Sequence, residues 1–180
     1  MSEYIEKYSA KLQEELNSAC REKGLYGERL PETPDIDITW DKIAGTYIAD
    51  ALREVEKYPL VALGWAMYAG MGVAVLWDKD WERYGKVENI YELMRDKRGF
   101  DAMDEYIRGE LMRLKGTEYD KMEQTVQSLS QRAESVLRHE NADPQSETAY
   151  RLFVATTRAL FRTGAGIELK RLKYDMEAMW

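Results

Sequence analysis

The chain has 180 residues, of which 44% are hydrophobic and 33% charged, a balance typical of a folded globular protein rather than a disordered or collagen-like one. Its net charge of -7 argues against binding to nucleic acid or anionic membranes, because both polyanions repel an acidic protein. The single cysteine, Cys20, excludes an intramolecular disulfide and suits a reducing compartment, so we expect a cytoplasmic protein.

The distribution of proline predicts an all-α fold. Only four prolines occur, so long stretches lack the residue that interrupts a helical backbone ladder. The alternating β-branched and aromatic runs that mark strands are missing; the nearest, residues 35–39, is short and follows Pro34. At this length we expect a single compact domain, residues 1–180, with about seven helices around a central apolar helix.

Two amphipathic helices are expected in the first third of the chain. Apolar residues at spacings of three and four predict one helix over residues 2–23. Residues 24–37 hold two glycines and two prolines and are expected to form a connection. The clearest periodic pattern covers 39–58, and Pro59 suits the first turn of the helix that follows.

The run 60–77 is 18 residues long without a charge, which reaches the lower limit for a transmembrane helix. It contains three glycines and four alanines and few large aliphatic residues, so its transfer into hydrocarbon is only weakly favourable. We therefore expect no membrane span, and we interpret the run as the central helix, covered on all sides by its neighbours.

Three further helices are expected between residues 89 and 140. The first begins at a capping box formed by Asn89 and Glu92 and ends at Gly99. The next two cover about 101–115 and 117–140, because each shows an apolar stripe at helical spacing.

The last helix is expected to begin at Asp143, as N-cap, with Pro144 in the first turn. Glycines in the segment 164–166 either kink this helix or split off residues 167–180, and the pattern leaves both alternatives open. Residues 163–167 resemble 69–73, since each segment holds a Gly-x-Gly. A close crossing of the two helices would explain this likeness, but we favour coincidence because few positions match.

No combination of residues predicts a catalytic, cofactor or metal site. His139 lies near a predicted helix end, where the helix dipole favours it, and Cys20 is expected to be a packed thiol. The acidic segments 35–37 and 78–82 lack the glycine and glutamate of a calcium-binding loop and are expected to be caps and turns. We therefore favour a protein that is not an enzyme and has no cofactor. The alternative is an enzyme that uses carboxylates alone for acid–base catalysis. The candidate residues are Asp50, Glu54, Asp78 and Asp80.

Large aromatic rings beside small residues indicate either ordinary core packing, which we favour, or an apolar ligand pocket. The residues of this predicted pocket are Trp65, Tyr68, Trp77 and Trp81. Residues 150–174 carry a local charge of +5, which favours contact with an acidic surface of the same chain; a twin subunit or a polyanionic ligand is the alternative. This basic patch consists of Arg151, Arg158, Arg162, Lys170 and Arg171.

The C-terminal segment ends with large apolar side chains, which are unusual at a terminus. Docking onto the chain's own core or onto a second subunit would explain Met176, Met179 and Trp180. The leading hypothesis is therefore a non-catalytic helical interaction protein that self-associates as a homo-oligomer and binds neither nucleic acid nor membrane. The alternative is a helical protein that binds a small molecule in the aromatic pocket.

Overall fold

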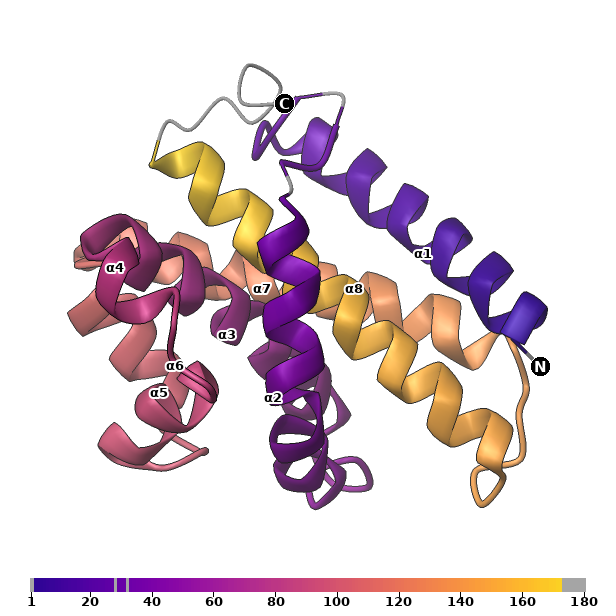
Figure 1. Ribbon diagram of the computed structural model, residues 1–180. Coiled ribbons are helices and arrows are strands. Elements are labelled where there is room, and N and C mark those ends of the chain that lie inside the picture. Colours follow the sequence, from indigo (N-terminus) through magenta and orange to yellow (C-terminus); the bar gives the residue numbers. More distant parts are fainter. Residues whose placement is uncertain (1, 28, 32, 173–180) are drawn as a thin grey trace.

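The computed structural model describes residues 2–27, 29–31 and 33–172, so the predicted interface residues Met176, Met179 and Trp180 lie outside the described residues. Within those ranges the chain forms only helices and no strand, which confirms the predicted all-α fold (Figure 1). The elements in chain order are α1 (Ser2–Glu22), α2 (Pro34–Leu52), α3 (Pro59–Lys79), α4 (Trp81–Tyr84), α5 (Ile90–Arg98), α6 (Met103–Glu105), the π-helix η1 (Tyr106–Leu111), α7 (Gly116–Arg138) and α8 (Glu147–Arg171).

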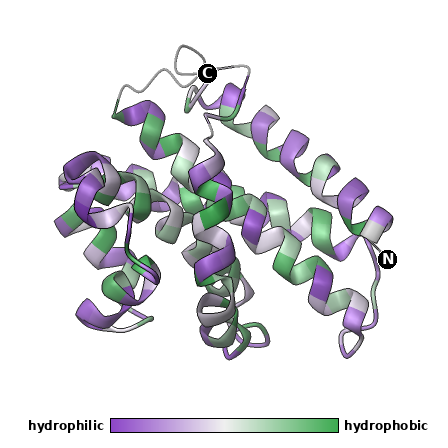
Figure 2. Ribbon diagram, in the orientation of Figure 1, coloured by the Kyte–Doolittle hydropathy of each residue, from purple (hydrophilic) through white to green (hydrophobic). Residues whose placement is uncertain are grey.

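Helix α3 is the central helix that the uncharged run predicts. It packs most extensively against α8, and also against α2, α5, α7 and η1. Among the described helices only α3 is long and apolar enough to cross a membrane, and 78% of its apolar window is buried inside the protein. This burial is compatible with a soluble protein. The outer helix α1 instead alternates hydrophilic and hydrophobic residues, as a helix with one face on the core must (Figure 2).

Two glycines allow α3 and α8 to cross in backbone contact. A Cβ atom on Gly70 would lie 2.1 Å from the carbonyl oxygen of Phe161, and one on Gly164 would lie 2.1 Å from that of Met67. No larger residue fits at either position without moving a helix. The prediction that the likeness between residues 69–73 and 163–167 is a coincidence is therefore wrong, because the two segments meet at this crossing.

The second glycine of each segment has a different neighbour, and α8 runs unbroken through Gly164 to Gly166. Gly72 faces side chains of α5 and η1, and Gly166 faces Leu30 and Pro31 of the connection before α2. The alternative of a helix split at these glycines is thereby excluded. They permit close approach by neighbours, and the hydrogen-bond ladder of α8 continues past them.

Several helix ends differ from the prediction because local capping groups outweigh apolar periodicity. Helix α2 begins at Pro34, five residues earlier than expected, since Thr33 accepts a hydrogen bond from the Asp35 amide. The predicted N-cap Asp143 is wrong: α8 begins at Glu147, and the Ser146 hydroxyl accepts from the Ala149 amide at 3.1 Å. The segment expected as a helix over 101–115 is one α-helical turn followed by the π-helix η1.

Candidate functional site

Two of the four predicted aromatic pocket residues line a cavity between α3 and α7, which we call the α3–α7 cavity. Its volume is about 170 Å³. The Trp65 and Tyr68 rings meet edge to face with their centroids 5.4 Å apart, and the Trp65 indole N–H donates to the Phe100 carbonyl at 2.7 Å. Trp77 and Trp81 form a separate pair, 5.3 Å apart. The cavity is lined by Leu60, Val61, Trp65, Tyr68, Asp104, Glu123, Val126, Gln127 and Ser130.

A single buried arginine joins the two carboxylates of this lining. Arg108, on η1, is only 2% exposed. Its Nη2 lies 2.8 Å from Asp104 Oδ2, and its Nη1 lies 2.9 Å from Glu123 Oε2. The guanidinium carbon also lies 4.1 Å from the ring centroid of Tyr119 and 5.4 Å from that of Tyr68. Two acids and two rings therefore surround the cation, and its Nε has no hydrogen-bond partner among the described residues.

Burial raises the pKa of two groups beside this arginine. It raises the pKa of Asp104 above its ordinary value, and the neighbouring Arg108 guanidinium offsets only part of that effect. It also raises the pKa of Tyr68, so this phenol stays protonated at neutral pH. A raised pKa means that the charge on Asp104 is incompletely compensated within the protein.

Ser130 supplies a polar atom that has no hydrogen-bond partner in the described part of the chain. The residue is 1% exposed, lines the α3–α7 cavity, and its Oγ lies against Gly64 of α3. A buried polar group without a partner costs about 1–3 kcal/mol, and native proteins usually satisfy such groups with protein, water or ligand. The hydroxyl therefore marks a place where a bound group would be stabilised.

Sequence reasoning missed Asp104, Arg108, Glu123 and Ser130. The only local signal is the acid–base pair at 104 and 108, which is ordinary on a solvated helix. Glu123 and Ser130 reach the cavity from α7, and only the packing of that helix against α3 brings them there. The π-helix that carries Arg108 was also unexpected, and π-helical turns are frequent at functional sites.

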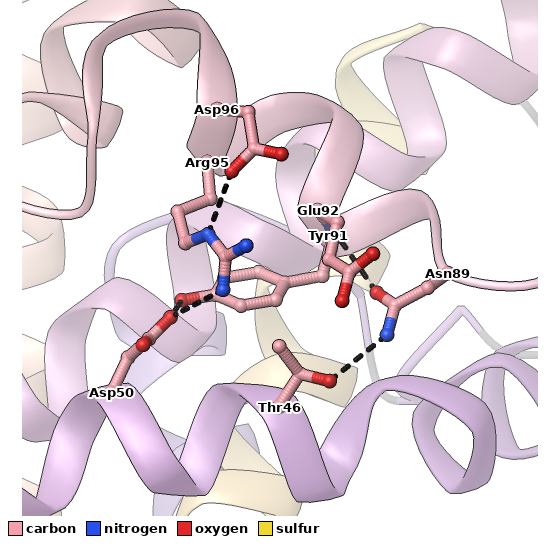
Figure 3. Close-up of polar contacts among 7 residues, drawn as sticks. All are labelled: Thr46, Asp50, Asn89, Tyr91, Glu92, Arg95 and Asp96. Atoms are coloured by element: carbon pink, nitrogen blue, oxygen red, sulfur yellow. Dashed lines mark hydrogen bonds and ion pairs between the residues drawn. The ribbon is translucent and has the colours of Figure 1, made fainter.

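The predicted candidate Asp50 belongs to a contact that holds α5 on α2 (Figure 3). Its Oδ2 accepts from the Tyr91 hydroxyl at 2.6 Å and from Arg95 Nη1 at 3.1 Å. One turn away, the Asn89 amide donates to the Thr46 hydroxyl at 3.0 Å, so a second bond joins the same two helices. These groups satisfy one another, and Asp50 is a structural carboxylate.

The structure does not gather the four carboxylate candidates into one site. Asp50 and Glu54 line a polar hollow of about 260 Å³ before the start of α3. Asp78 and Asp80 are exposed at the C-terminal end of α3. The 21 residues of α3 extend about 30 Å, and this length separates the two pairs of carboxylates. Asp80 caps α4 by accepting from the Arg83 amide at 3.2 Å.

Acids of the same chain pair with most of the predicted basic patch. Asp37 lies 2.9 Å from Arg158 and 3.6 Å from Arg162. The other pairs are Arg151 with Glu147 at 2.7 Å and Arg171 with Glu168 at 2.6 Å, while Lys170 is exposed. The local charge of +5 already includes Glu168, so Asp37 and Glu147 offset two of these five units and compensate the α8 segment only in part.

Cys20 and His139 occupy structural positions. Cys20 is fully buried on α1, and burial raises the pKa of its thiol to about 11. The His139 ring is hydrogen-bonded through Nδ1 to the Ser135 carbonyl oxygen at 2.7 Å, just past the end of α7. No group of three histidine, cysteine or acidic residues that could hold a metal ion occurs in the part of the chain that the structure describes.

No protein-family model, curated protein or solved structure matches this chain. These comparisons assign it neither a function nor a partner.

Proposed function

We propose that this chain is a small-molecule-binding helical protein whose site is the α3–α7 cavity. The observation that carries the proposal is the buried Ser130 hydroxyl, which lines the cavity and lacks a partner among the described residues. The cavity volume of about 170 Å³ lies below the range of about 300–1,000 Å³ typical of ligand pockets. The ligand is therefore small, with the bulk of roughly six water molecules at about 30 Å³ each.

The lining of the cavity fits a ligand with an apolar and a polar part. Leu60, Val61 and Val126 offer aliphatic contact, with the Trp65 and Tyr68 rings beside them. The polar groups of the same lining are Asp104, Glu123, Gln127 and Ser130. Mostly apolar walls with a few polar groups are the usual composition of a binding site.

A fragment screen by NMR tests this function. The Trp65 indole N–H is the reporter, because it lines the cavity, and the Trp65→Phe variant identifies its resonance. We expect a fragment of the stated size to shift this resonance, and Val61→Phe, which fills part of the cavity, to abolish the shift. Val75→Phe is the matched control, since Val75 is also half-buried on α3 but does not line the cavity. A broad panel that leaves Trp65 unshifted would refute the function.

We also propose, as a second function, that the chain self-associates. A groove of about 730 Å³ separates the start of α1 from the first half of α8, and Tyr150, 48% exposed, lies on it. Its lining holds both Glu6 and Arg151, so the same face of a second copy offers charges of both signs. Light scattering after size exclusion should show a discrete oligomer that Tyr150→Glu converts to a monomer of 21.0 kDa. A truncation after Lys173 tests the predicted tail, and a full chain that is monomeric at high concentration overturns self-association.

We place the protein in the cytoplasm. Its one cysteine is a buried free thiol, which suits a reducing compartment. Its net charge of -7 favours solubility and repels nucleic acid and anionic membranes. Fractionation of cells that express the full chain would test this location.

A further inference from the structure

The α3–α7 cavity carries a net negative charge. Asp104 and Glu123 share one guanidinium, that of Arg108, so two carboxylates face a single cation. Glu105 adds a further negative charge that acts on Asp104. None of the described lining residues is basic. An anionic ligand would be repelled here, whereas a cation would reduce the energy of the largely buried Asp104 carboxylate and attract the exposed Glu123 carboxylate.

Hydrogen-bond acceptors outnumber donors in the same lining. Arg108 is bonded to one oxygen of each carboxylate, Asp104 Oδ2 and Glu123 Oε2, and an ionised carboxylate accepts at about four lone-pair sites. The Ser130 hydroxyl, which lacks a described partner, also accepts. An ammonium group has three donors and no acceptor, which complements such a set.

The remaining walls favour an organic cation over a bare metal ion. Leu60, Val61 and Val126 are aliphatic, and the faces of aromatic rings such as Trp65 and Tyr68 attract cations. We propose that the ligand of this cavity is a small alkylamine whose ammonium group lies beside Asp104 and Glu123. This inference rests on the proposed small-molecule function. The cavity volume limits the amine to about three to six carbon atoms.

Three molecules with the same branched four-carbon skeleton and different charge test the inference on the full-length protein. Isobutylamine, isobutanol and isobutyrate are titrated separately while the Trp65 indole resonance is followed by NMR. We expect the amine to bind at least about tenfold more tightly than the alcohol, because charge-assisted hydrogen bonds are roughly twice as strong as neutral ones. Isobutyrate should not bind.

Variants that lack one negative charge test the same inference. Glu123 is 59% exposed at its side chain, so Glu123→Gln should fold normally while it weakens isobutylamine binding by about five- to tenfold and leaves isobutanol binding within about twofold. Glu134→Gln is the matched control on the same helix, since Glu134 does not line the cavity and should leave both affinities unchanged.

The outcomes separate this inference from the function on which it rests. Equal binding of amine and alcohol, tighter binding of isobutyrate, or no effect of Glu123→Gln would each overturn the cation while the cavity remains a binding site. If none of the three molecules shifts the Trp65 resonance, the amine inference fails, and failure of the wider fragment panel then removes the proposed function as well.

Discussion

Replacing Gly164 with alanine tests whether backbone contact between α3 and α8 stabilises the fold. The added Cβ would lie 2.1 Å from the Met67 carbonyl oxygen and 2.8 Å from its carbonyl carbon. Both atoms belong to the backbone, so no side-chain rotation can relieve the overlap. Ordinary van der Waals contact begins near 3.4 Å, and the two helices must therefore move about 1.3 Å apart.

The size of the effect follows from this displacement. A gap of 0.5–1 Å already loses a quarter to a half of a contact's dispersion energy, and α3 with α8 is the most extensive helix interface described. Overpacking costs about 1–3 kcal/mol and sometimes more, while alanine gains about 1 kcal/mol of helix propensity over glycine. The overlap is severe, so we take the upper end of the overpacking cost, and after the gain in propensity we expect Gly164→Ala to lower the free energy of unfolding by about 1–2 kcal/mol and the melting temperature by about 2–8 °C.

Urea denaturation followed by circular dichroism measures the change, and Gly45→Ala is the matched control. Gly45 lies inside helix α2, and a Cβ atom there would meet nothing within 4 Å. The same substitution should therefore stabilise the protein by about 0.5–1 kcal/mol, through helix propensity alone. The reasoning is refuted if Gly164→Ala is as stable as the wild type, or if the two substitutions shift stability in the same direction.

Three further predictions concern buried polar groups. Burial raises the pKa of Cys20 to about 11, so only about one thiol in a thousand is ionised at pH 8. A thiol reagent should therefore modify Cys20 slowly in the folded protein and rapidly in urea. Equal rates of modification under the two conditions would contradict the burial of Cys20. Tyr91→Phe removes the hydrogen bond to Asp50 and should cost about 1.5–3 kcal/mol in urea denaturation; an unchanged midpoint and slope would show that this bond does not stabilise α5 on α2. Burial raises the pKa of Glu168 above 4.5, so the folded chain holds that proton more tightly than the unfolded chain. Glu168 therefore contributes its full share to the free energy of unfolding below pH 4.5, and this contribution is lost as the pH rises through the raised pKa. We expect the free energy of unfolding of the wild type to fall relative to that of Glu168→Gln over this pH range, and a difference that does not change with pH would refute the prediction.

Local chemistry determines the helical character of this protein. Apolar residues at helical spacing predict α1 and α7 to within a few residues, and Asn89 caps α5 as its position before Glu92 indicates. The uncharged run that becomes α3 predicts a central helix, because only burial suits a helix that is apolar on every side. These features depend on neighbours within one or two turns, and such neighbours are visible in the sequence.

Tertiary packing alone decides the candidate site. Arg108 meets Glu123 across 15 positions, and the α1–α8 hydrogen bond between Tyr8 and Thr156 spans 148. The glycines at 70 and 164 are visible in the sequence, yet only the docked helices show that Gly70 lies against the backbone of α8 and Gly164 against the backbone of α3. A residue's partner across such distances depends on how whole helices pack, and the free energy of that packing is shared among many side chains. For this reason the sequence determines which segments are helical, while the three-dimensional structure determines which side chains surround the cavity.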